Sequence, residues 1–152
     1  MRRAKLNCIY LWFHECDLSL LRFNAFYLGD YLTDSSTTIA ELKVAVKKFC
    51  DARDWDQFHP PKDLAIGVST EAAELLDLFR FKTEKQIATM LSEPKKRDAI
   101  AEELADTLYF LLRFAQMNGF DLSDELIKKL KKNDEKYPVE KAKGSNKKYN
   151  EV

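Results

Sequence analysis

The chain has 152 residues, of which 45% are hydrophobic and 33% are charged. These proportions are typical of one globular domain and exclude a disordered chain. Its 25 basic residues balance 25 acidic ones, which argues against a nucleic-acid-binding protein, because such proteins carry a basic excess. No apolar stretch is long enough to span a membrane, so we expect neither a nucleic acid nor a membrane as partner. Cys8, Cys16 and Cys50 lack the spacing of a disulfide framework or a zinc site and favour a reducing, cytoplasmic setting.

The N-terminal segment, residues 1–36, differs in composition from the rest of the chain. It is rich in aromatic residues and poor in charged ones, and no functional motif falls within it. Two interpretations remain open: an additional helix with an apolar face, or a segment that is not native to the folded unit. We therefore expect an N-terminal extension at residues 1–36, followed by one domain, residues 37–152, which includes a Lys-rich C-terminal tail.

The first predicted helix begins at a capping box. Thr38 is followed three residues later by Glu41, so that each side chain can accept a hydrogen bond from the backbone of the other. Apolar residues then recur at intervals of three and four, as on one face of a helix. They are Ile39, Leu42, Val46 and Phe49. The helix must end before residues 55–61, because two prolines close that segment.

Three further helices follow in the same way. Their predicted ranges are residues 63–79, 94–118 and 123–137. A polar connection is predicted at residues 83–92, between the helices at 63–79 and 94–118. Ser92 and Pro94 are the predicted cap and first turn of the helix at 94–118, and Gly119 is its stop signal. Glycine and proline are too few for a β-sandwich. The sequence predicts an all-α fold, an antiparallel four-helix bundle.

The helix at residues 94–118 carries a long apolar stripe. The residues predicted to share it are Ile100, Leu104, Leu108, Leu111 and Ala115. Tyr109 and Phe110 lie beside this stripe, and we expect one of the two to face the core. The pattern leaves open which one it is.

Four carboxylates stand where a core is expected. Glu71 and Glu74 lie three residues apart on one predicted helix, and Glu103 and Asp106 repeat this spacing on another. If the two helices pack antiparallel, the four acids converge, and their mutual repulsion opposes folding unless a cation neutralises it. An all-oxygen ligand set favours Mg²⁺, Mn²⁺ or Ca²⁺. The alternative is that both pairs lie on solvated helix faces.

Together with the carboxylate pairs, several ordered blocks carry a family resemblance. They are Trp55-x-x-Phe58-His59-x-Pro61-x-x-Leu64, Glu71-x-x-Glu74, Phe79-x-Phe81-Lys82-Thr83, Glu103-x-x-Asp106 and Lys129-x-x-x-Asn133-x-x-Lys136-Tyr137-Pro138. In their order and spacing they resemble the all-α nucleoside triphosphate pyrophosphatases, the MazG-like superfamily, and within it the dCTP pyrophosphatase branch. The match extends from about Thr37 to the C-terminus.

The resemblance implies an enzyme that uses Mg²⁺, with Mn²⁺ as a substitute, to cleave a nucleoside triphosphate into the monophosphate and pyrophosphate. It implies Glu71, Glu74, Glu103 and Asp106 as the catalytic metal ligands; which glutamate acts as a general base stays open. It also implies a homodimer or homotetramer with the site near a subunit interface. The branch favours dCTP or a related pyrimidine as the nucleotide substrate, in clearing unwanted nucleotides from the cellular pool.

The block at the end of the last helix is a candidate for binding phosphate. Lys129, Asn133 and Lys136 fall on one helical face, where the lysines supply charge and the asparagine a neutral donor, and Tyr137 closes the block. For the two lysines the alternative is a solvated basic face. Asn133 occupies an apolar-stripe position, which makes a purely solvated role less natural.

Three residues are candidates for binding the base. Trp55 and His59 lie on the proline-bounded loop, and Phe81 follows the second helix at a position where some members of the dCTP branch carry tryptophan. Aromatic rings stack on bases, and a histidine can form a hydrogen bond with a base edge. The alternative is that Trp55 and Phe58 pack the first helix against the second.

Two alternatives to this function remain. The first is a non-catalytic, oligomeric helical bundle that serves as an interaction module, with its carboxylates in solvent. The second is a phosphoribosyl-ATP pyrophosphohydrolase of the same superfamily, against which the Trp55 and His59 block argues.

Overall fold

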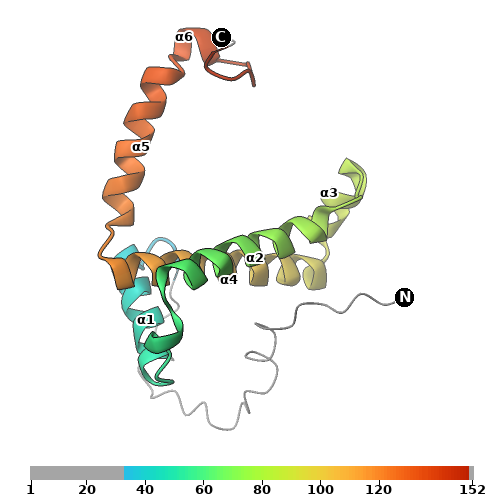
Figure 1. Cartoon of the computed structure of the whole chain (residues 1–152). Helices are drawn as coiled ribbons and strands as arrows, with labels where there is room; N and C mark the ends of the chain where they lie inside the picture. Colours follow the sequence, from blue (N-terminus) through green and yellow to red (C-terminus); the bar gives the residue numbers. More distant parts are fainter. Residues whose placement is uncertain (1–32, 151–152) are drawn as a thin grey trace. The chain divides into compact units, whose positions relative to one another are not determined.

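The computed structural model describes residues 33–150 (Figure 1). The chain divides into two units, residues 1–36 and 37–152, and the account below concerns the second. The prediction of an N-terminal extension falls almost entirely on residues 1–32 and so lies outside the described part of the chain.

The described residues are helical and contain no strand, which confirms the predicted all-α class. The elements in chain order are α1 (Ile39–Asp51), the 3₁₀ helix η3 (Asp56–Phe58), α2 (Pro61–Phe79), α3 (Glu84–Ser92), α4 (Pro94–Asn118), α5 (Leu122–Lys136) and α6 (Val139–Ala142). Among these helices, none has the length and hydropathy of a transmembrane span.

The structure confirms the two helix ends that the sequence marked most clearly, which are the start of α1 and the end of α4. Thr38 caps α1 through a complete capping box: its backbone N–H donates to Glu41, 2.7 Å away, and the Glu41 N–H donates to its hydroxyl at 3.2 Å. At the C-terminal end of α4, Gly119 has a φ of 72°, in the left-handed region that glycine enters at no steric cost.

The connection between α2 and α4 corrects two predictions. The stretch expected to be a polar connection is the helix α3, which begins at a capping box of Thr83 and Gln86. Ser92 is not the cap of α4: its hydroxyl donates back to carbonyls of α3, and Glu93 occupies the cap position. A helix this short has too few apolar positions for a clear periodicity, and it is packing on α4, with Met90 buried, that stabilises it.

The α2–α4 pair is the main packing contact of the domain, and the two helices run side by side in Figure 1. They meet tightly at Gly67, where an added Cβ would lie 2.4 Å from Cδ1 of Phe110. The ring of Phe110 therefore occupies the space that any other side chain at position 67 would fill. This contact fixes the antiparallel register of the two helices.

The buried face of α4 differs in part from the predicted stripe. Ile100 and Ala115 are buried as expected, but Leu104, Leu108 and Leu111 are 53%, 40% and 42% exposed. The residues buried instead are Phe110, Leu112 and Arg113. Phe110 is thus the core member of the pair left open by the sequence, whereas Tyr109 is half-buried. Apolar residues surround this helix on more than one face, so periodicity alone could not select the face that meets α1 and α2.

The helix predicted from Ser123 forms as α5, but none of its side chains is buried. In Figure 1 it leads away from the α2–α4 pair beyond Gly119. The helices that pack on α4 are α1, α2 and α3.

We expect Gly67→Ala to destabilise the domain by about 1–3 kcal/mol, because the new methyl group overlaps the ring of Phe110. Urea denaturation measures this change in the free energy of unfolding. Ser69→Ala, an exposed change on the same helix, is the control and should leave this free energy almost unchanged. Combining Gly67→Ala with Phe110→Leu should cost less than the sum of the two single changes; additive costs would show that the contact does not limit the packing.

Candidate metal centre

Three of the four predicted carboxylates converge between α2 and α4. One oxygen each from Glu71, Glu103 and Asp106 lies within 4.8 Å of the others, and all three residues are half-buried. Glu74 does not belong to this triplet, although it is half-buried on the same stretch of α2 and its charge acts on all three members. The predicted convergence is therefore present for three of the four acids, and Glu74 lies beside them.

The register set by Gly67 and Phe110 explains why these acids meet. Glu71 lies one turn after Gly67 on α2, and Asp106 lies one turn before Phe110 on α4. Because the helices are antiparallel, the two acids face each other across the same seam. One turn further from the Gly67–Phe110 contact, Glu74 on α2 lies level with Glu103 on α4.

Burial and mutual repulsion make these groups hard to ionise. Burial, followed by the charges of Asp106, Glu74 and Glu103, raises the pKa of Glu71 to about 7. Burial and the neighbouring carboxylates likewise raise the pKa of Glu103 and that of Asp106. Around neutral pH the cluster thus holds more negative charge than its surroundings stabilise, which is the condition that a bound cation relieves.

The donor set fits a hard divalent cation. All the converging ligand atoms are carboxylate oxygens, and within residues 33–150 neither a histidine nitrogen nor a cysteine sulfur joins the group. Mg²⁺ and Mn²⁺ prefer such ligands, and half-burial leaves room for the water molecules and phosphate oxygens that complete their coordination.

The loop before α2 holds Trp55 and His59 together. The Trp55 ring meets the His59 ring edge-on at 6.3 Å and the Phe49 ring of α1 at 5.5 Å. Phe49 in turn contacts Tyr109 at 6.2 Å, one turn beyond Asp106 on α4. The loop is thereby connected to α4 near the carboxylates. Trp55 does pack on α1, as the alternative interpretation held, whereas Phe58 is 51% exposed.

Phe81 has an unusual conformation for a bulky residue. Its φ is 61°, in the left-handed region, and its side chain is 89% exposed. The guanidinium of Arg80 lies 4.7 Å from the centre of its ring. Positive φ at a residue other than glycine costs energy and is found where the surrounding structure imposes it. The turn after α2 thus presents this ring to the exterior.

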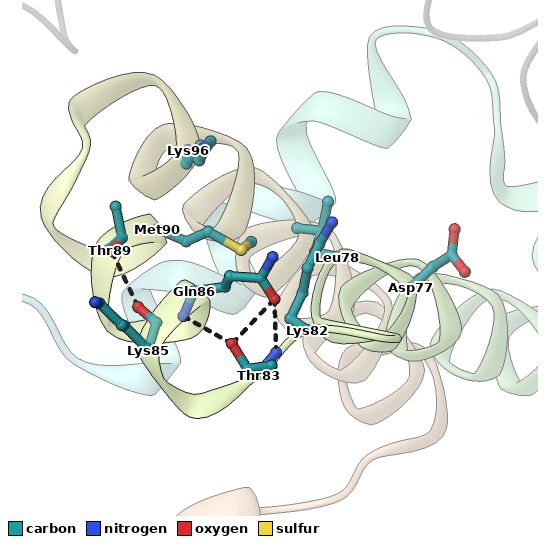
Figure 2. A pocket seen from close by; sticks show the side chains of 9 residues that line it. All are labelled: Asp77, Leu78, Lys82, Thr83, Lys85, Gln86, Thr89, Met90 and Lys96. Carbon is teal, nitrogen blue, oxygen red and sulfur yellow. Dashed lines mark hydrogen bonds between the residues drawn. The ribbon is translucent and has the colours of Figure 1, made fainter.

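A cavity of about 690 Å³ that the sequence did not indicate lies beside this turn (Figure 2). It is lined by residues from the end of α2, from α3 and from the start of α4, three of which are lysines: Lys82, Lys85 and Lys96. Figure 2 shows the Thr83–Gln86 capping hydrogen bonds at its edge. Lys96 pairs with Glu93 at 2.9 Å.

The candidate phosphate-binding block lies on α5. Lys129 and Lys136 are exposed, Asn133 is half-buried, and the Tyr137 ring contacts that of Tyr149 at 6.1 Å. Because α5 leads away from α2 and α4 in Figure 1, the described part of a single chain does not bring this block to the carboxylates.

Arg113, which the sequence motifs did not indicate, is fully buried and paired with the Trp55–His59 loop. A signal was present, because an arginine interrupts the apolar run of α4 two turns beyond Asp106, on the same face. The contact between Cys50 and Tyr109, whose sulfur and hydroxyl lie 3.1 Å apart, is likewise one that the sequence did not indicate. Burial raises the pKa of that hydroxyl well above its ordinary value.

The model of the MazG-like family matches residues 66–152 of this chain. The chain belongs to the MazG-like family. It is 32% identical over 124 residues to dCTP pyrophosphatase 1 of Rattus norvegicus and of Homo sapiens, covering 82% of this chain and 73% of each relative. A crystal structure of a pyrophosphatase from Archaeoglobus fulgidus is 32% identical and superposes with a TM-score of 0.61, over 66% of this chain and 92% of that one. The predicted family and enzyme class, a nucleotide pyrophosphohydrolase, are confirmed.

Without metal, we expect the Glu71→Gln variant to gain stability relative to the natural protein as the pH rises. The pKa of Glu71 is about 7 in the folded state against 4.5 ordinarily, so between these values the folded chain binds more protons than the unfolded one. The natural protein therefore loses stability as the pH rises through this window, whereas glutamine does not titrate. Urea denaturation in EDTA at about pH 5 and about pH 8 measures the difference.

Glu135→Gln, on the exposed last turn of α5, is the matched control and should follow the natural protein at both pH values. A stability difference between Glu71→Gln and the natural protein that does not change with pH would show that Glu71 ionises freely.

Proposed function

We propose that this protein is a Mg²⁺-dependent pyrophosphohydrolase that converts dCTP, or a closely related pyrimidine nucleotide, into the monophosphate and pyrophosphate. The observation that carries the proposal is the convergence of Glu71, Glu103 and Asp106, with Glu74 beside them, in a chain of this family. The name of the relatives, dCTP pyrophosphatase 1, supports the choice of base and sugar.

In this proposal the carboxylates of α2 and α4 hold Mg²⁺, or Mn²⁺ in its place. A bound ion of this kind neutralises charge on phosphate oxygens and lowers the pKa of a water molecule. The chain supplies the remaining parts: fixed ligand positions on two rigid helices, a half-buried setting, and a carboxylate to accept the proton of the attacking water. Which of the four acids accepts that proton is a separate question from which of them bind the ion.

The base is held by aromatic rings. Trp55, fixed edge-on against Phe49, provides one stacking surface. The exposed ring of Phe81 lies beyond the opposite end of α2, a helix of 19 residues, so it provides a second stacking surface for the same base only from another copy of the chain. Stacking is tolerant of base identity because every base has a π-face. Selection among bases therefore requires a polar contact with the base edge, for which His59 is the candidate.

The protein acts as a homodimer or homotetramer. The exposed apolar residues of α4 and α5 form two stripes of the kind that subunit contacts cover. They are Leu104, Leu108 and Leu111 on α4 and Leu126, Ile127 and Leu130 on α5. A second copy that covers these stripes brings Lys129, Asn133 and Lys136 from its own α5 toward the carboxylates and the phosphates bound there, with Tyr137 at the end of the block.

We expect Glu74→Gln and Asp106→Asn each to lower dCTP turnover by about 100-fold or more, because each change weakens metal binding and the charge stabilisation it supplies. Pyrophosphate release with Mg²⁺ measures turnover. The melting temperature in EDTA should stay unchanged or rise, since one of four repelling charges is removed.

Glu135→Gln is again the control and should retain full turnover. A variant that retains turnover but melts earlier in EDTA would show that the acids are structural. Absence of turnover on any nucleoside triphosphate by the natural protein would favour a non-catalytic interaction module.

We expect Trp55→Ala and His59→Ala to have different effects on base selection. Loss of the Trp55 ring should lower kcat/KM for all bases alike, by about ten-fold or more, because stacking contributes about 1–3 kcal/mol per base. Loss of His59 should lower kcat/KM most for dCTP and narrow its advantage over dUTP, dTTP, dATP and dGTP. Equal losses for every nucleotide in His59→Ala, or a natural preference for a purine, would contradict this assignment.

A further inference from the structure

Arg113 is the one charged side chain of the described residues that is fully buried. Its guanidinium donates hydrogen bonds in three directions: to Asp56 of η3, to Gln116 one turn along α4, and from Nε to Nδ1 of His59 at 3.1 Å. Two of these three partners belong to the loop that precedes α2, more than fifty residues earlier in the chain. The loop and α4 are therefore joined by one buried group.

The chemistry of these partners determines the state of His59. A guanidinium has only donors and does not lose its proton, so the ring nitrogen that receives its N–H must carry a lone pair. A neutral imidazole has a single N–H, which must then be on Nε2. The charged groups that face the ring are Arg113 from α4 and Asp56 from η3; burial first, and the Arg113 charge second, lower the pKa of His59, against a smaller opposing effect of Asp56.

We propose that Arg113 is a positioning residue, which fixes His59 as the neutral Nε2–H tautomer and holds the Trp55–His59 loop in place for the nucleotide. The idea deepens the proposed function and rests on it. In this state the ring offers a ligand one donor and no acceptor. The group that it recognises is therefore a hydrogen-bond acceptor that cytosine offers and that uracil and thymine lack, the unprotonated ring nitrogen N3.

The rest of the loop supports a positioning role. The edge-on contact between Trp55 and His59 means that a movement of one ring displaces the other. Asp56 is the other loop residue bound by Arg113, and its side chain is 55% exposed. Its carboxylate therefore remains largely in solvent while it attracts the buried guanidinium toward the loop. Without Arg113, the loop keeps its prolines and its contact with Phe49 but loses its attachment to α4.

The tautomer can be read directly by ¹⁵N NMR of the histidine rings in the full-length chain. His14 is the only other histidine, so His14→Gln assigns the signals. In the natural protein we expect the Nε2–H form and a pKa for His59 below its ordinary 6.5. Arg113→Met should give a mixture of tautomers and a higher pKa, while Arg97→Met, an exposed change on the same helix, should leave both unaltered.

Kinetics then distinguish positioning from a general structural role. We expect Arg113→Met to lower kcat/KM for dCTP by about ten-fold, the loss of a hydrogen bond to a charged group, and to narrow base selection as His59→Ala does. The double variant should lose no more than His59→Ala alone. Arg113→Lys keeps the positive charge but cannot form all three hydrogen bonds of the guanidinium. It should therefore restore the stability of the fold more than the selectivity for dCTP.

Three results would overturn the proposal: an Nδ1–H tautomer in the natural protein, an unchanged His59 spectrum in Arg113→Met, or losses that are equal for all bases and additive with His59→Ala. The tautomer in the natural protein is measured without any variant, so this test decides the proposal even if Arg113→Met fails to fold. If instead the natural protein hydrolyses no pyrimidine triphosphate, the proposed function fails, whereas the spectra still decide whether Arg113 fixes the tautomer.

Discussion

The close approach of α2 and α4 at Gly67 and Phe110 is the contact on which the rest of the domain depends. A glycine there lets the aromatic ring lie against the helix backbone, and any larger side chain separates the helices or shifts them. Once the register is fixed, Glu71 and Asp106 face each other one turn away. In the opposite direction the next residues of the seam are Leu64 and Arg113, both fully buried. One packing contact thus positions both the carboxylates and the anchor of the loop.

The carboxylate cluster works against the stability of the metal-free fold. Burial and repulsion raise the pKa of Glu71 to about 7, so the acids are held at a free-energy cost that the surrounding apolar contacts must offset. A cation that binds the folded state alone returns part of that stability through mass action. In the proposed function, the same unneutralised charge that weakens the metal-free domain gives the site its affinity for a metal ion and, through the ion, for phosphate.

Helix α4 connects the separate parts of the proposed site. It carries Glu103 and Asp106, contacts α1 through the Phe49–Tyr109 pair, and holds the base-binding loop through Arg113. A change at one part is therefore expected to be felt at the others, because the helix is a rigid body. Tyr109, which lies between Asp106 and Arg113 along α4, is half-buried and places its hydroxyl 3.1 Å from the buried Cys50 sulfur of α1.

The sequence by itself determined the features that depend on near neighbours: the Thr38 capping box, the stop at Gly119, the spacing of both acid pairs, and the motif blocks that mark the family. These features depend on backbone geometry over one or two helical turns, so the spacing of residues in the sequence is enough to predict them. Only the tertiary structure decided which face of α4 is buried, because Leu104, Leu108 and Leu111 satisfy the same periodicity as the residues that meet α1 and α2. The partners of Arg113 were likewise beyond the sequence, since Asp56 and His59 come from a distant loop. Nor could the pattern show that α5 buries no side chain against the described residues of its own chain, because amphipathicity specifies an apolar face but not the surface that covers it.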